Sequence, residues 1–272
     1  MNKALVGLSD NINQNIYKIE LWYRSFKRHS NADVVLLAAN SSNEETELLL
    51  SIGIIPIKIH VDNTLYINHK RLDHTKQYIE NSQYDLFIVT DVFDVYFQSD
   101  PFAKLDTDKY DIFVSGEGVN VNQEPWNSQN ISTLFPDKID ICLDKEIINS
   151  GIIAGKKKQL VQLYNKMYDL CEKSNDSHNI KDQAALNVLV ASDEIDNLKI
   201  FNLDDSWAMH CAVAGPTQFF HAWGFDRNIK YRIPKMINNK ICSGNGSEYD
   251  IVHQFNRIPA WNNIIYENMR SS

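Results

Sequence analysis

The sequence has few cysteines, and no two of them lie close together. Its four cysteines stand at positions 142, 171, 211 and 242, which indicates neither a zinc knuckle nor a redox-active pair. Isolated reduced thiols are typical of a protein kept in a reducing compartment. We therefore expect a cytoplasmic protein.

Long apolar runs are also missing. Residues 4–8 form a short run that is not long enough for the core of a signal peptide. No segment reaches the roughly 20 apolar residues that a membrane-spanning helix needs. Hydrophobic residues still make up 43% of the 272 positions, enough for a sizeable core. Because no linker, repeat or low-complexity tract divides the chain, we expect one domain.

Basic residues are outnumbered by acidic ones, and the formal net charge is −8. An acidic chain does not attract polyphosphate non-specifically, which argues against a nucleic acid as partner. If the protein binds a phosphorylated ligand, a cation must neutralise that ligand locally.

The first half of the chain alternates between strand and helix patterns. Short apolar runs predict buried strands at residues 4–8, 34–39, 54–59 and 86–90. The segments between them predict helices at residues 16–26, 42–52 and 68–81. Ser42 and Glu45 fit a capping box, and Gly53 is suited to end the helix that they open. This alternation predicts a parallel sheet covered on both faces, with ligands at the carboxyl ends of its strands.

The second half is less regular. We expect strands at residues 111–115 and 152–155 and helices at residues 157–172 and 182–191. After residue 202 the chain is rich in His, Trp, Phe and Gly and has little periodicity. We interpret it as the irregular C-terminal portion of the same domain.

An acidic pair follows the predicted strand at residues 86–90. Asp91 and Asp94 flank two apolar residues, and carboxylates on one tight turn can bind a hard cation such as Mn²⁺ or Mg²⁺. The alternative is a pair of loop aspartates that accept hydrogen bonds from backbone amides. An EF-hand is excluded because its ligand spacing and central glycine are missing.

The sequence from Thr90 to Phe102 has the pattern Thr-Asp-x-x-Asp-Val-x-Phe-Gln-x-Asp-Pro-Phe. It resembles the Asp-x-Asp metal motif of GT-A glycosyltransferases, in the spaced form Asp-x-x-Asp. Glycogenin-like enzymes, collagen-lysine glucosyltransferases and small glycosyltransferases of bacteria and large DNA viruses are similar. The resemblance implies a single α/β GT-A domain over residues 1–272, with a mostly parallel central sheet flanked by helices. It also implies that about residues 1–115 bind the nucleotide and about residues 116–272 the sugar and acceptor.

Two further segments resemble glycogenin-like enzymes. Asn149, Ser150 and Gly151 match an Asn-x-Gly segment whose glycine lets the backbone approach a sugar closely. Asp182 and Gln183 match the start of an Asp-Gln-x-x-x-Asn helix. The resemblance implies catalytic roles for Asn149, Asp182 and Gln183, and sugar or acceptor contacts for Ser150 and Gly151. The alternative for Asp182 is a helix N-cap.

A histidine near the C-terminus completes the metal site in the same enzymes. By resemblance, His253 is the third ligand, and Arg257 pairs with the diphosphate. His221, in a His-x-x-Gly pattern, is the competing ligand. The usual Gly-x-x-Lys-Pro-Trp tail is absent, and Arg257 stands as the replacement for its lysine.

The remaining predicted contacts concern the donor nucleotide and the acceptor. The nucleotide is expected over the first strand, near Leu8 and Ser9. Arg71 is placed to reach it from the predicted helix at residues 68–81, before the acidic turn. The alternative for Arg71 is a solvated helix surface. Trp207 and Trp223 are candidates for stacking on acceptor sugars, and core packing is their alternative.

The resemblance implies a glycosyltransferase that moves a hexose or similar sugar from a nucleotide-diphosphate donor, a UDP-sugar by family habit, to a glycan or other hydroxyl acceptor. It implies Mn²⁺ or Mg²⁺ as cofactor and retention of configuration. A sugar-nucleotide pyrophosphorylase is excluded because residues 7–11 lack the required Gly-rich basic loop. A non-catalytic carbohydrate- or nucleotide-sugar-binding protein on the same scaffold is the second hypothesis. The sequence does not identify the sugar or the acceptor.

Overall fold

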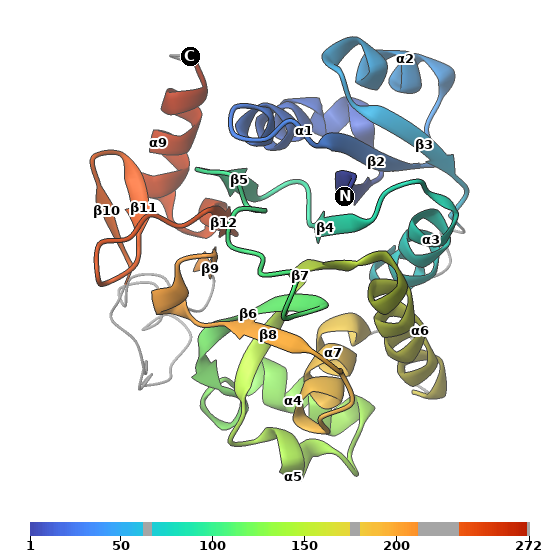
Figure 1. Ribbon diagram of the computed structural model, residues 1–272, viewed down its shortest axis with the longest axis vertical. Coiled ribbons are helices and arrows are strands. Elements are labelled where there is room, and N and C mark those ends of the chain that lie inside the picture. The colour runs from blue at the N-terminus through green and yellow to red at the C-terminus, as the bar shows by residue number, and fades with distance from the viewer. Residues whose placement is uncertain (62–66, 175–179, 212–233, 271–272) are drawn as a thin grey trace.

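The computed structural model describes residues 1–61, 67–174, 180–211 and 234–270 (Figure 1). His221 and Trp223 therefore lie outside the described residues. Within these ranges, no helix combines the length and the apolarity needed to cross a membrane.

A seven-stranded sheet forms the centre of the molecule, in the order β3-β2-β1-β4-β7-β6-β8. β7 runs antiparallel to both of its neighbours, and the other pairings are parallel. The predicted mostly parallel sheet is thereby confirmed. Its strands are β1 (Lys3–Ser9), β2 (Asp33–Ala39), β3 (Ile55–Ile59), β4 (Leu86–Thr90), β6 (Ile112–Asn120), β7 (Glu146–Lys156) and β8 (Leu198–Phe201).

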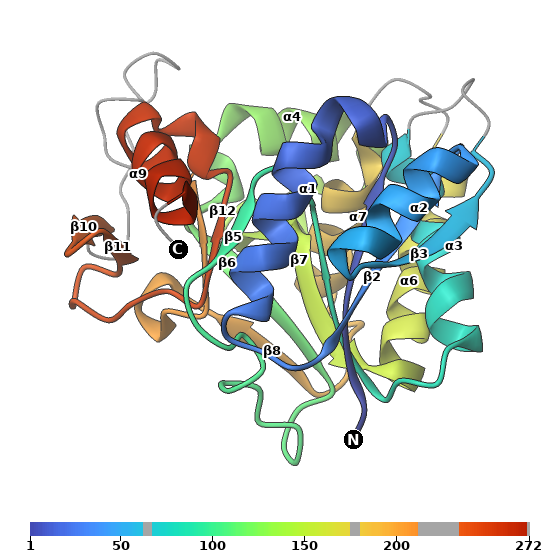
Figure 2. The ribbon, with the colours of Figure 1, turned by 90° about the horizontal axis from the view of Figure 1, so that it is seen from above.

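Helices cover both faces of this sheet (Figures 1 and 2). One face packs against α1 (Ile12–Lys27) and α2 (Asn43–Ile52). The helices on the other face are α3 (Ile67–Asn81), α4 (Pro125–Leu134), α5 (Ile139–Cys142), α6 (Lys157–Lys173) and α7 (Lys181–Ala191).

The apolar runs of the sequence explain this layering. Successive side chains of a strand point to opposite faces, so Leu5 joins the core under α1 while Val6 joins the core under α3 and α6. A sheet that is buried on both faces needs apolar residues at every position, which is why these strands are continuous apolar runs and not alternating ones.

The predicted start and end of α2 are confirmed. Ser42 accepts a hydrogen bond from the amide of Glu45, and the carboxylate of Glu45 accepts one from the amide of Ser42. Gly53 ends the helix with a φ of 94°, a conformation that favours glycine.

A second, smaller sheet joins distant parts of the chain. It consists of β5 (Val95–Phe97), β12 (Ile251–His253) and β9 (Ala208–His210), in that order. β12 pairs antiparallel with β5 and parallel with β9. The hairpin of β10 (Lys235–Ile237) and β11 (Lys240–Cys242) lies beside it, and α9 (Pro259–Arg270) closes the described chain.

The expected division near residue 115 falls inside β6, so the central sheet takes strands from both halves. β1 to β4 come from the first half, and β7 and β8 come from the second. The two halves thus share one sheet and one pair of cores.

Candidate functional site

The loop between β4 and β5 carries the acidic pair at the carboxyl end of β4. The amide of Asp91 donates to the carbonyl of Gly151 at 2.8 Å. The indole of Trp22 donates to the hydroxyl of Thr90 at 2.9 Å. These bonds fix the start of the loop against β7 on one side and α1 on the other.

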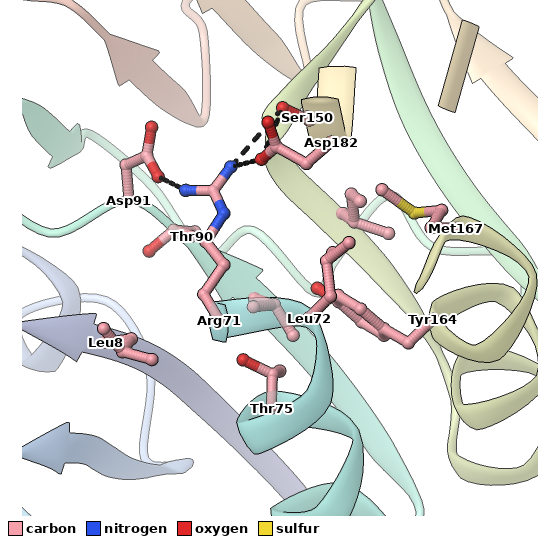
Figure 3. A pocket seen from close by; sticks show the side chains of 12 residues that line it. Leu8, Arg71, Leu72, Thr75, Thr90, Asp91, Ser150, Tyr164, Met167 and Asp182 are labelled. Carbon is pink, nitrogen blue, oxygen red and sulfur yellow. Dashed lines mark hydrogen bonds and ion pairs between the residues drawn. The ribbon is translucent and has the colours of Figure 1, made fainter. Parts of the chain in front are cut away.

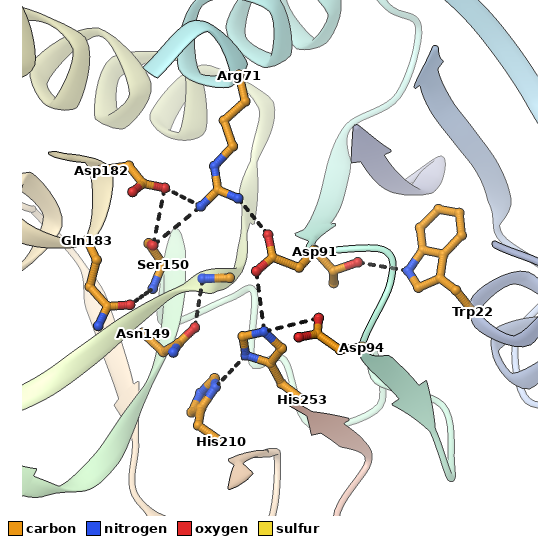
Figure 4. A network of polar contacts seen from close by, with 12 residues as sticks. Trp22, Arg71, Asp91, Asp94, Asn149, Ser150, Asp182, Gln183, His210 and His253 are labelled. Atoms are coloured by element: carbon orange, nitrogen blue, oxygen red, sulfur yellow. Dashed lines mark hydrogen bonds and ion pairs between the residues drawn. The ribbon is translucent and has the colours of Figure 1, made fainter. Parts of the chain in front are cut away.

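The small sheet brings His253 to this loop (Figure 4). The amide of Gln254 donates to the carbonyl of Asp94 at 2.7 Å. The Nε2 atom of His253 lies 3.3 Å from a carboxylate oxygen of Asp91 and 3.6 Å from one of Asp94. One ligand atom from each of the three residues lies within 4.8 Å of the others.

Several features of this cluster fit a divalent cation. The Nε2 atom of His253 is buried and has no hydrogen-bond partner among the described residues. A Cβ atom on Gly151 would lie 2.5 Å from the His253 ring and 2.7 Å from Asp91, so only glycine leaves this space open. Two carboxylates and an imidazole are a donor set that Mn²⁺ or Mg²⁺ can use.

The electrostatics of the three groups depend on one another. Burial alone would raise the pKa of Asp91, but Arg71 and His253 hold it well below its usual range. Burial raises the pKa of Asp94, although His253 opposes the rise. Burial would lower the pKa of His253, but Asp94 and Asp91 raise it above its usual value. The cluster therefore carries uncompensated negative charge when His253 is neutral, which favours binding of a cation.

Arg71 of α3 joins this cluster to Asp182. Its guanidinium contacts Asp91 at 2.5 Å, forms an ion pair with Asp182, and lies 3.4 Å from the hydroxyl of Ser150. Burial alone would lower the pKa of Arg71, but Asp182 and Asp91 raise it far above its usual value. Arg71 is therefore an internal bridge, and the interpretation as a solvated surface residue is wrong.

A pocket opens beside this bridge (Figure 3). Its wall includes Leu8 at the end of β1, Arg71 and Thr75 from α3, and Asp182 from α7. Ser9 follows Leu8 and is buried, with its hydroxyl donating to the carbonyl of Asp10. The pocket thus brings the predicted nucleotide contacts Leu8, Arg71 and Asp91 together with Ser150 and Asp182.

The start of α7 holds the β7 segment in place. Asp182 is fully buried in the first turn of α7, whose N-cap is Ile180, so the N-cap alternative for Asp182 is wrong. The carboxylate of Asp182 accepts from the hydroxyl of Ser150 at 3.3 Å. Gln183 accepts from the amide of Ser150 at 3.3 Å, and its amide group donates to Asn127 at 2.9 Å.

Glu117 is a site residue that the sequence analysis missed. It is buried in β6, where its carboxylate accepts from the side-chain amide of Asn149 at 2.6 Å. The other end of the Asn149 side chain accepts from the amide of Gly151 at 2.7 Å. Burial raises the pKa of Glu117 to about 7. The signal in the sequence is an acidic residue between two glycines directly after an apolar run.

We expect the stability of the parent protein to fall, relative to Glu117→Gln, as the pH rises. The pKa of Glu117 is about 7 in the folded state against 4.5 for the free side chain. Between these values the folded state keeps a proton that the unfolded state has released, so folding becomes less favourable with rising pH. Glutamine keeps the shape and cannot ionise.

Urea unfolding at pH 5 and pH 8 checks this expectation. From pH 5 to pH 8, the free energy of unfolding of the parent should fall by about 2–3 kcal/mol relative to that of Glu117→Gln. Glu80→Gln, an exposed change on α3, is the control, and the stability of the parent relative to this variant should not fall between these pH values. A constant difference for Glu117→Gln would contradict the expectation.

A second missed group lies behind His253. His210 is fully buried on β9, with its Nδ1 atom 3.0 Å from the Nδ1 atom of His253. Its Nε2 atom lies 2.6 Å from the hydroxyl of Ser115. Burial, and next the charge of His253, hold the pKa of His210 well below its usual value, so this imidazole is neutral.

The remaining predicted residues have different outcomes. Arg257 is exposed at the end of the 3-10 turn Phe255–Arg257, near enough for its charge to oppose the rise in the pKa of Asp94. Trp207 is fully buried, packs at a tilt against the ring of Phe201, and donates its indole hydrogen to the carbonyl of Pro101. The predicted acceptor role of Trp207 is therefore corrected: its ring faces are covered by the core and cannot stack on a sugar.

Comparison with known proteins places this chain in a family. The family model described as nucleotide-diphospho-sugar transferase matches residues 81–249, more than half of the chain. The chain belongs to this family, and its Asp91–Asp94 pair fits the family's Asp-x-Asp type of motif. A search of curated proteins finds no match.

Solved structures agree on the fold. The galactosyltransferase LgtC, in complex with donor and acceptor sugar analogs, superimposes with a TM-score of 0.59 and 14% identity, covering 97% of this chain and 95% of that chain. An active-site mutant of LgtC gives a TM-score of 0.56 and 12% identity, covering 92% of this chain and 86% of that chain. The fold is therefore that of a GT-A glycosyltransferase.

Proposed function

We propose that this protein transfers a hexose or similar sugar from a UDP-sugar to a hydroxyl group of a glycan, with Mn²⁺ or Mg²⁺ and with retention of configuration. The observation that carries the proposal is the pair of adjoining clusters at the end of β4. Asp91, Asp94 and His253 offer ligand atoms within 4.8 Å of one another, and Arg71 links them to Asp182.

The arrangement suits a donor that spans both clusters. The cation cluster, with the exposed Arg257 nearby, would hold the diphosphate. A cation bound there would stabilise the negative charge that develops on the departing phosphate oxygens. The nucleotide would lie over the end of β1, at Leu8 and Ser9, where the wall of the pocket begins.

The sugar would lie between Asp182 and the β7 segment. Asn149, Ser150 and Gly151 approach it from β7, and Asp182 and Gln183 approach it from α7. Asp182 has one buried carboxylate oxygen without a hydrogen-bond partner among the described residues. That oxygen is available to a sugar hydroxyl or to the positive charge that develops at the anomeric carbon.

The acceptor oxygen would then form its bond to the anomeric carbon on the face from which the diphosphate leaves, and its proton would pass to the departing phosphate oxygen. The resemblance to glycogenin-like segments supports this retaining course. Such a reaction requires no protein nucleophile. Asp182 and Gln183 would stabilise the positive charge that develops on the sugar as the bond to the diphosphate breaks.

Thermal unfolding with a panel of nucleotide sugars, each with and without Mn²⁺, tests the proposal. A true donor at 100 times its Kd should stabilise the folded state by about 2.7 kcal/mol, and only when Mn²⁺ is present. The nucleotide sugar that stabilises the protein most should also be the one that it hydrolyses fastest. NMR of the first product should show the anomeric configuration of the donor. Binding of a donor without hydrolysis or transfer would favour the non-catalytic binding protein instead.

A further inference from the structure

His210 lies directly behind the proposed cation site. The parallel pairing of β9 with β12 sets His210 opposite His253, and their rings meet at 89°. The Nδ1 atoms of the two rings are 3.0 Å apart, and both side chains are buried. The Ser115 hydroxyl lies 2.6 Å from the Nε2 atom of His210, so His253, His210 and Ser115 form a line from the cluster into the core. Figure 4 shows the contact between His210 and His253.

The short distance between the two Nδ1 atoms restricts where the hydrogens can be. Two N–H groups cannot face each other at hydrogen-bond distance, and two bare nitrogens would repel, so one ring donates and the other accepts. The direction matters for His253. If its Nδ1 atom donates, a neutral His253 has a free lone pair on Nε2, the atom that faces Asp91 and Asp94.

We propose that His210 is a positioning residue that accepts the Nδ1 hydrogen of His253 and thereby holds the tautomer whose Nε2 lone pair points at the cation site. The inference rests on the proposed function, because that function requires a cation at Asp91, Asp94 and His253. The hydrogen of a neutral His210 is then on Nε2, and Ser115 accepts it.

The consequence of losing the acceptor follows from the same geometry. Without it, a hydrogen on Nδ1 of His253 would be buried with no partner, which disfavours that tautomer. A hydrogen on Nε2 would instead face the negative charge of the Asp91 carboxylate, whose nearest oxygen lies 3.3 Å away. The apo protein would then favour the tautomer that cannot bind a cation, and cation binding would have to reverse this preference.

A matched pair of variants separates this role from simple packing. His210→Leu removes the acceptor, and His210→Asn places an amide oxygen near the position of Nδ1 in a side chain of nearly the same size. Leucine and asparagine side chains have the same branching and the same number of heavy atoms, fewer than histidine, so each variant replaces the ring by a side chain of the same outline. Only a hydrogen-bonding role distinguishes them.

Titration of the full-length protein with Mn²⁺, followed by the EPR signal of the free ion, gives the affinity without any turnover. We expect His210→Leu to weaken binding by about 10- to 100-fold and His210→Asn to bind within about threefold of the parent. Equal affinities of the parent and His210→Leu would overturn the inference and leave the proposed function standing. A parent protein that bound no Mn²⁺ would overturn the cation site itself, and the inference with it.

Two further measurements do not depend on the folding of His210→Leu. Ser115→Ala removes the partner at the far end of the line, and we expect it to weaken Mn²⁺ binding by about threefold to tenfold. Nitrogen NMR of the parent imidazoles with Mg²⁺ should show the hydrogen on Nδ1 of His253 and on Nε2 of His210. The opposite tautomers would overturn the inference.

Discussion

Asp94→Asn should reduce cation-dependent sugar transfer by at least about 10³-fold, because the amide removes one of two anionic ligands and part of the charge stabilisation at the diphosphate. The apo protein should not lose stability. Burial raises the pKa of Asp94, so the ionised carboxylate is unfavourable in the folded state, and a neutral amide relieves that cost.

Transfer rates over a range of Mn²⁺ concentrations, together with unfolding in a chelator, check this expectation. Asp108→Asn, an exposed change in the turn at residues 107–109, is the control and should match the parent in both assays. Full activity of Asp94→Asn in a chelator would rule out the cation assignment.

Arg71→Met should lower the free energy of unfolding by about 2–4 kcal/mol, because it leaves the carboxylate of Asp182 buried without its partner. The Asp182 side chain is 0% exposed, and that of Arg71 is 22% exposed, so solvent screens the pair only in part. The change also leaves Asp91 without the guanidinium that holds its pKa low.

A double-mutant cycle with Asp182→Asn tests the origin of the loss. The double variant should recover part of the stability that Arg71→Met loses, because the uncompensated charge is gone. Arg24→Met is the control: its side chain is 57% exposed and forms one ion pair with Glu20 at 3.7 Å. Equal stabilities of Arg71→Met and Arg24→Met would show that the bridge contributes nothing.

The first half of the fold follows closely from the sequence. The apolar run at residues 86–90 coincides with β4, and the Ser42–Glu45 capping box starts α2 where it was expected. These elements depend on local patterns, such as apolar runs, helical spacing and caps, which a sequence displays directly.

The small sheet could not be predicted in the same way. β5, β9 and β12 have three residues each, too few to show a period, and each exists because of partners far away in the chain. For that reason His210 gave no signal in the sequence. The burial of Trp207 could not be predicted either, because the sequence of an irregular segment does not reveal which side chains face the core.

The residues of the candidate site were found through a resemblance, and their roles stay predictions. Asp91, Asp94 and His253 do come together, and so do Ser150, Asp182 and Gln183. Glu117 was missed because the predicted strand stopped at residue 115, whereas β6 continues to Asn120. A buried carboxylate at the end of a strand depends on what packs over it, and a local pattern does not contain that information.

The pairing of β5 with β12 has a consequence for evolution and engineering of the chain. Gln98, just after β5, bonds through its side chain to the carbonyl of Tyr249, 151 residues later, so the chain between them is one closed loop. Loop closure costs free energy that grows only slowly with length. Insertions between these two points, at exposed turns, should therefore leave the spacing of Asp94 and His253 nearly unchanged.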